Sequence, residues 1–141
     1  MSCFATGQTD RVIAVDTNII VRLVVADDER QLALALDLVS REDIYVSLTV
    51  LIETEWVLRS RFGYSRADIH VALSALPLLL RLHVEAPDDV EWALDRYALG
   101  GELADYLHIA SARTIGRFAS FEKKLAHRAG PDAPATVELI E

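Results

Sequence analysis

The chain has 141 residues, a length that fits one domain with a hydrophobic core of its own. Hydrophobic residues make up 52% of it, which excludes an intrinsically disordered protein, and a single cysteine, Cys3, excludes an internal disulfide framework. The net charge of −8 argues against a nucleic-acid-binding surface spread over the whole protein, because such surfaces are basic. Two arrangements would still allow that function: acids gathered in a cation site, or acids placed away from a local arginine cluster.

No apolar run is long enough to span a membrane, and residues 1–10 lack the basic, apolar and cleavage segments of a signal peptide. No repeat, low-complexity tract or linker divides the chain. We therefore expect one domain over residues 1–141, with residues 1–10 as a loose tail, in the reducing cytoplasm and without membrane association.

The first predicted element is a short strand over residues 12–15, Val-Ile-Ala-Val, whose composition is typical of a parallel strand buried on both faces. Asp16 follows it directly, and apolar residues resume at helical spacing from Ile19. An acid at this junction lies at the carboxyl edge of the sheet, where open α/β folds place their sites. Asp16 is therefore a candidate for chemistry, and a simple helix N-cap is an equally good interpretation.

The rest of the chain alternates between the two hydrophobic periodicities, which predicts an α/β fold with a mostly parallel sheet. Capping residues, prolines and glycines set the limits of the elements. The expected elements are a helix over 28–41, a strand over 44–48, helices over 49–62 and 65–76, a strand over 82–84, helices over 87–99 and 102–115, a strand over 118–121, a helix over 123–128 and an edge strand over 136–140.

The helix over 49–62 contains two acids that helical geometry separates. Glu53 shares a face with the apolar residues Trp56 and Val57, three and four positions later. Glu55 has Arg59 four positions later, the favourable order for a surface ion pair. The pattern favours Glu53 as the buried, functional acid and Glu55 as a surface residue, although the Glu55 side is also partly apolar.

Five acids follow a strand directly or lie early in the helix after it: Asp16, Glu53, Glu102, Asp105 and Glu122. In one parallel sheet these positions converge on a single edge. Carboxylates about 4 Å apart repel by several kcal/mol, about 4 at an effective dielectric near 20, unless a cation neutralises them. Oxygen ligands favour Mg²⁺ or Mn²⁺, which can activate water for attack on a phosphodiester without a covalent nucleophile.

Other residues have a structural interpretation that outweighs the functional one. His108 could ligate a metal, but a packed or supporting histidine is the better interpretation. Core packing is the better interpretation of Trp56 and Trp92. Four arginines could form an RNA-facing patch or a solvated surface: Arg22, Arg59, Arg61 and Arg66.

Three segments together resemble one family. They are Val-Asp-Thr-Asn-Ile-Ile-Val-Arg-Leu over residues 15–23, Glu53-x-x-Trp56-Val-Leu-Arg over 53–59, and Asp105-x-x-His108. From about residue 11 to its end the chain is similar to the PIN-domain ribonucleases, specifically the VapC toxins of type II toxin-antitoxin modules. The resemblance implies a three-layer α/β/α sandwich with four or five mostly parallel strands, and a homodimeric endoribonuclease that depends on Mg²⁺ or Mn²⁺. It also implies a cognate antitoxin as partner and RNA, such as tRNA or rRNA, as substrate.

The resemblance also implies roles for single residues. Asp16, Glu53 and Asp105 match the metal-binding and catalytic acids, Asn18 would orient Asp16, and Glu102 matches a further acid ahead of Asp105.

The departure from the family is at Glu122. Ser-Phe-Glu ends at this residue, where the family usually has Thr-Phe-Asp, and the extra methylene changes the reach of the carboxylate. Glu122 stays a candidate catalytic and metal-binding acid. The rival interpretation is an interaction protein that keeps the fold and has lost turnover.

Overall fold

The structure is a computed structural model that describes residues 11–79 and 81–141. Predictions for the tail over residues 1–10 lie outside the described residues. The elements are β1 (Val12–Ala14), α1 (Thr17–Val25), α2 (Glu29–Arg41), β2 (Asp43–Val46), α3 (Leu48–Phe62), α4 (Arg66–Ala75), a 3-10 turn η2 (Leu76–Leu78), β3 (Leu82–Val84), α5 (Pro87–Leu99), α6 (Leu103–Ser111), β4 (Arg117–Ser120), α7 (Leu125–Ala129) and β5 (Thr136–Leu139).

Local sequence signals explain where the helices begin. The side chains of Asp16, Asp28, Ser47 and Ser65 each accept a hydrogen bond from a backbone N–H in the first turn of the helix that follows. Pro87 opens α5, where the absence of its N–H costs nothing. The predicted helix and strand positions therefore hold to within a few residues.

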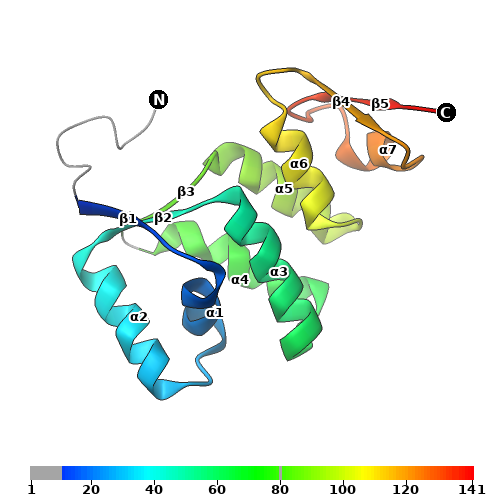
Figure 1. Ribbon diagram of the computed structural model, residues 1–141. Coiled ribbons are helices and arrows are strands. Elements are labelled where there is room, and N and C mark those ends of the chain that lie inside the picture. Colours follow the sequence, from blue (N-terminus) through cyan, green and yellow to red (C-terminus); the bar gives the residue numbers. More distant parts are fainter. Residues whose placement is uncertain (1–10, 80) are drawn as a thin grey trace.

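All strand pairs in the described part of the chain are parallel, which confirms the predicted α/β class. The five strands are, however, divided between two sheets: β1-β2-β3 and β4-β5. Figure 1 shows β4 and β5 beside α7, away from the three-stranded sheet. Each strand has only three or four residues, and β4 pairs with β5, where Arg117 donates two hydrogen bonds to Glu138 at 2.6 and 2.8 Å.

β1 is an edge strand, so the prediction that it is buried on both faces was wrong. Among residues 11–79 and 81–141 it pairs only with β2, Ile13 is 42% exposed, and Ala14 is also exposed. The apolar composition of residues 12–15 indicated a strand correctly, but composition does not show how many neighbours a strand has.

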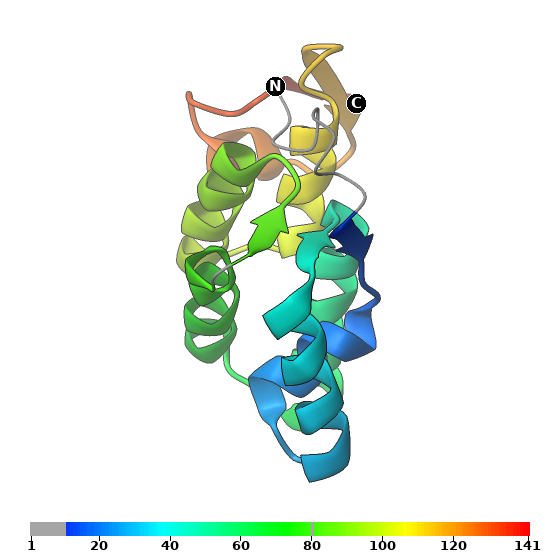
Figure 2. The same cartoon turned by 90° about the vertical axis from the view of Figure 1, so that its left-hand side faces the viewer.

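The core lies between the three-stranded sheet and the helices, and it includes Ile44 on β2, Leu58 on α3 and Tyr106 on α6. In Figure 2, α4 and α5 lie on the opposite side of β3 from α1 and α3. Among the described residues, no helix is long and apolar enough to cross a membrane.

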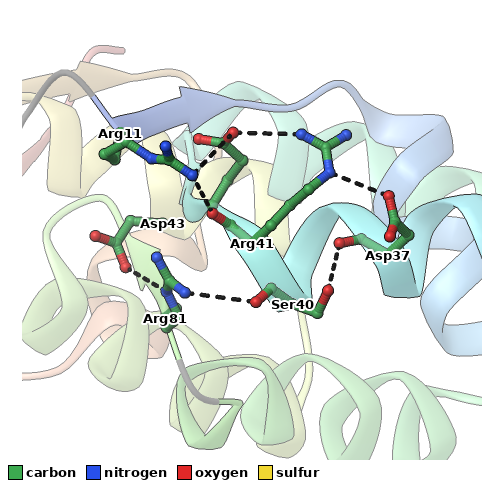
Figure 3. Close-up of polar contacts among 7 residues, drawn as sticks. Arg11, Asp37, Ser40, Arg41, Asp43 and Arg81 are labelled. Carbon is green, nitrogen blue, oxygen red and sulfur yellow. Dashed lines mark hydrogen bonds and ion pairs between the residues drawn. The ribbon is translucent and has the colours of Figure 1, made fainter.

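Polar contacts join the segments at the amino edge of the three-stranded sheet (Figure 3). Arg11, before β1, donates to the carbonyl of Arg41 at the end of α2, at 3.0 Å. Arg81, before β3, donates to Asp43 on β2 at 3.2 Å and to the carbonyl of Ser40 at 3.4 Å. These contacts fix the edge opposite the helix starts, which leaves the carboxyl edge to carry the candidate site.

Candidate active site

Asp16 lies where β1 ends and α1 begins. Its Oδ1 accepts a hydrogen bond from the backbone N–H of Ile19 at 3.2 Å, so Asp16 is the N-cap of α1. The residue is nevertheless exposed, and it lines a pocket between α1 and α3. Capping uses one carboxylate oxygen and leaves the other available, so the two interpretations of Asp16 are compatible.

Glu53 reaches the same pocket from the second turn of α3. Helices α1 and α3 pack against each other, and the buried hydroxyl of Thr17 donates to Glu53 Oε1 at 2.5 Å. This hydrogen bond fixes the carboxylate of Glu53 beside the start of α1. The structure therefore brings Asp16 and Glu53 to one place, as the sequence predicted.

The predicted burial of the two acids on α3 was wrong, because it is Glu55 that is buried and Glu53 that is exposed. The predicted partner of Glu55 is present: Arg59 Nε donates to its Oε2 at 2.8 Å. The hydroxyl of Tyr97, on α5, donates to the same oxygen at 3.2 Å. Tyr97 covers Glu55 from a distant part of the chain, which the pattern within α3 could not reveal.

The cavity that Asp16 and Glu53 share, here called the α1–α3 pocket, has a volume of about 350 Å³. Its lining consists of Asp16, Thr17, Asn18, Val21, Arg22, Glu53, Trp56, Val57, Arg61 and Phe62. The carboxylates come from the early turns of the two helices and the guanidinium groups from their later turns. Asn18 lines the pocket but makes no hydrogen bond to Asp16 in the described structure.

The other three acids lie around the start of α6. Glu102 is the N-cap residue of α6, Asp105 lies half-buried in its first turn, and Glu122 follows β4. Burial raises the pKa of Asp105, the charge of Glu102 raises it further, and His108 opposes the shift. The charge of Glu122 also raises the pKa of Asp105, by less than Glu102 does. Both glutamates therefore interact electrostatically with Asp105.

Glu122 also has a local structural role. Its Oε1 accepts from the backbone N–H of Lys124 at 3.2 Å, and its own N–H donates to Ser120 Oγ at 2.9 Å. Glu122 thus stabilises the turn between β4 and α7. Its role as a metal ligand stays a prediction.

Glu122 follows β4, which belongs to a different sheet from β1, so the prediction that all five acids follow the strands of one parallel sheet was wrong for Glu122. Over residues 11–79 and 81–141, no group of three or more His, Cys, Asp or Glu is arranged to hold a metal ion. Mg²⁺ is nevertheless often bound by only one or two carboxylates together with waters. The pair Asp16 and Glu53 offers oxygen donors of the right kind for Mg²⁺ or Mn²⁺.

Sequence reasoning missed one exposed aromatic residue of the pocket. Trp56 is 49% exposed and lines the α1–α3 pocket, so its predicted core position was wrong. Trp92 was correctly predicted to pack: it contacts the core, and its ring meets that of Tyr106 edge to face at 5.9 Å. The position of Trp56 beside Glu53, three residues earlier, was the available signal, because the two share a helix face.

Comparison with known proteins gives one match. Neither the curated proteins nor the solved structures contain a chain that matches this one. The sequence profile of the PIN domain matches residues 13–131, which is most of the chain and includes the five candidate acids Asp16, Glu53, Glu102, Asp105 and Glu122. The chain therefore belongs to the PIN domain family.

Proposed function

We propose that this protein is an endoribonuclease that depends on Mg²⁺ or Mn²⁺ and hydrolyses RNA phosphodiesters. Membership of the PIN domain family suggests a nuclease-type function. The observation that carries the more specific proposal is the position of Asp16 and Glu53, two carboxylates from adjacent helices in one pocket. Such a pair is the kind of site that holds a divalent cation with open positions for water and phosphate.

Asp16 and Glu53 would hold the cation, with Thr17 keeping the Glu53 carboxylate in place and Asn18 available to contact it. A divalent cation at this place would supply positive charge to a phosphodiester oxygen and to an attacking water.

Asp105, Glu102 and Glu122 are proposed as further acids of the same reaction. Burial and the charge of Glu102 raise the pKa of Asp105, so this carboxylate holds a proton more readily than an isolated aspartate does.

The biological role that we propose is that of a toxin in a toxin-antitoxin pair, acting on tRNA or rRNA as a homodimer and inhibited by a cognate antitoxin. This part rests on the resemblance of residues 15–23 and 53–59 to VapC toxins. A small gene next to the coding sequence, whose product binds this protein and relieves growth arrest on its expression, is the expected genetic finding.

The test of the enzyme is cleavage of total RNA and of purified tRNA with Mg²⁺, with Mn²⁺ and with EDTA, by the native protein and by three variants. Asp16→Asn and Asp105→Asn are expected to lower cleavage at least a hundredfold. Asp95→Asn makes the same chemical change at an exposed acid of α5 outside the site and should leave cleavage intact. Discrete products that need the cation and are lost in the two site variants would support the proposal.

The alternative is a PIN-fold interaction protein without turnover, which the departure at Glu122 from the usual aspartate favours. Titration with Mn²⁺ separates the two functions. If Mn²⁺ does not bind to the folded native protein, or binds equally well to Asp16→Asn, the enzyme proposal is refuted and the interaction protein remains.

A further inference from the structure

The α1–α3 pocket contains an aromatic surface that the proposed cation site does not use. Trp56 lies one turn after Glu53 on α3, about 4.5 Å further along the helix axis. Its side chain is half-exposed and lines the pocket, although indole rings are largely buried in most proteins. An exposed aromatic face beside a polar site is the feature on which proteins stack unpaired bases.

The pocket also contains a guanidinium group that has no partner among the described residues. Arg59 is paired with Glu55, Arg66 donates to the carbonyls of Tyr97 and Gly101, and Arg22 is paired with Asp27. Among the four arginines that could form a patch, Arg61 alone makes no hydrogen bond or ion pair in the described part of the chain. It is exposed, and it lies about 12 Å beyond Glu53 along α3.

A second guanidinium points to a ligand in the same place. Arg22 lines the pocket from α1, and its Nε atom is buried and has no hydrogen-bond partner within the described residues. Unpaired buried donors are rare, because each costs free energy unless a protein group, water or ligand accepts its hydrogen bond. An anion between Arg22 and Arg61 would lie against the guanidinium group that carries this donor.

We propose that the α1–α3 pocket is a nucleotide subsite, in which one unpaired base of an RNA stacks on Trp56 and the adjoining phosphate lies on Arg61 and Arg22. This inference rests on the proposed function and extends it to the recognition of the substrate. The order of side chains along α3 is Glu53, Trp56 and then Arg61, so the base lies between the cation site and the phosphate that Arg61 binds.

The size and chemistry of the pocket select single-stranded RNA. A volume of about 350 Å³ is near the lower limit for pockets that hold small ligands, and it suits one nucleotide rather than a helical segment. Bases inside a duplex are already stacked and cannot offer a face to Trp56. The subsite therefore favours loops and unpaired ends over double-stranded regions.

The chain contains two tryptophans, which makes a direct test possible. In Trp92→Phe, Trp56 is the single indole, and its fluorescence reports on stacking. Titration with a short single-stranded oligoribonucleotide in EDTA, where no cation-dependent cleavage occurs, is expected to quench this fluorescence to saturation. Trp56→Phe, which keeps only the packed Trp92, should show no quenching, and a duplex of the same sequence should quench Trp92→Phe far less.

Affinities from the anisotropy of a labelled oligoribonucleotide complete the test. Trp56→Ala is expected to raise Kd about tenfold. Arg61→Ala should also weaken binding and reduce the slope of log K against log salt by about 0.7, the value for one phosphate contact on a single strand. Arg30→Ala removes an exposed arginine of α2 that has no partner in the described structure, and it should change neither quantity.

The proposal would be overturned by an absence of quenching in folded Trp92→Phe, or by equal effects of Arg61→Ala and Arg30→Ala. It would also be overturned if Trp56→Ala left RNA affinity unchanged and instead dissociated an oligomer in light scattering, since Trp56 would then be a subunit contact. Cleavage by the native protein with no Trp56 signal refutes the subsite and retains the enzyme. RNA binding in EDTA, together with no cleavage in Mg²⁺ or Mn²⁺, retains the subsite and refutes the enzyme.

Discussion

The two acids of α3 differ in their surroundings, and exchanging each for glutamine should separate structure from chemistry. Glu55 is 7% exposed and accepts hydrogen bonds from Arg59 and Tyr97. Glu53 is exposed and accepts one hydrogen bond, from Thr17. We expect Glu55→Gln to lower the free energy of unfolding and leave cation binding intact. We expect Glu53→Gln to weaken cation binding and leave the free energy of unfolding nearly unchanged.

The expected magnitude follows from the contacts of Glu55. A hydrogen bond to a charged group contributes about 1.5–3 kcal/mol, which sets the scale for the bond from buried Tyr97. The side chain of Arg59 is 51% exposed, so its ion pair adds only about 0.5 kcal/mol. Glutamine keeps one acceptor oxygen, and the expected loss of unfolding free energy for Glu55→Gln is therefore about 1–3 kcal/mol. For the exposed Glu53→Gln we expect a change below about 0.5 kcal/mol.

Urea unfolding followed by circular dichroism measures the stabilities, and Mn²⁺ titration measures cation affinity. Glu53→Gln should weaken Mn²⁺ binding while its unfolding midpoint stays near that of the native protein. The reasoning would be refuted if Glu55→Gln were as stable as the native protein, because the buried carboxylate would then contribute nothing. Loss of Mn²⁺ binding in a folded Glu55→Gln protein would move the cation site to the other side of α3.

Three further predictions concern the packing around the site. Burial, helped by the charge of Glu55, raises the pKa of Tyr97 to about 12, so folding favours the neutral phenol. The stability that the neutral phenol of Tyr97 contributes is fully present below pH 10 and is lost as the pH rises toward 12. In urea unfolding across that window, the native protein should lose about 3 kcal/mol more of its unfolding free energy than Tyr97→Phe loses. Leu58→Ala, at a fully buried position of α3, should cost about 2–5 kcal/mol, again by urea unfolding. Gly101→Ala places a Cβ against the hydroxyl of Tyr106 at a φ of +83°, and thermal unfolding should show a loss of at least about 1 kcal/mol. An unchanged midpoint would contradict both the close contact and the backbone strain at this position.

Local signals along the chain were sufficient to predict the elements. The caps at Asp16, Asp28, Ser47 and Ser65 are properties of a few neighbouring residues, and the structure uses all four. Parallel pairing also followed from the alternation of helices and strands. These features depend on short-range geometry, which a single sequence contains.

The errors concern contacts between distant segments. The helical pattern of α3 correctly placed Glu55 beside Arg59, but burial of Glu55 depends on Tyr97, 42 residues later. The exposure of Trp56 depends on how α1 packs against α3. β4 and β1 lie in different sheets because each pairs with a different strand. A strand of three or four residues contains little sequence information about which strand it pairs with.

The pairing of distant charges also explains how an acidic chain can offer a site for RNA. Many of its acids stabilise the fold: Asp28 caps α2, and Asp89, buried at the start of α5, accepts two hydrogen bonds from Arg113 at 2.6 and 2.8 Å. Inside the α1–α3 pocket, two carboxylates face two guanidinium groups, so the formal charge of the lining is zero despite the net charge of −8. A divalent cation beside the two carboxylates would make the pocket positive, and the attraction of RNA to it should therefore rise with the cation concentration. The net charge of the chain thus disfavours unspecific binding along a nucleic-acid backbone and leaves binding of one nucleotide at one pocket possible.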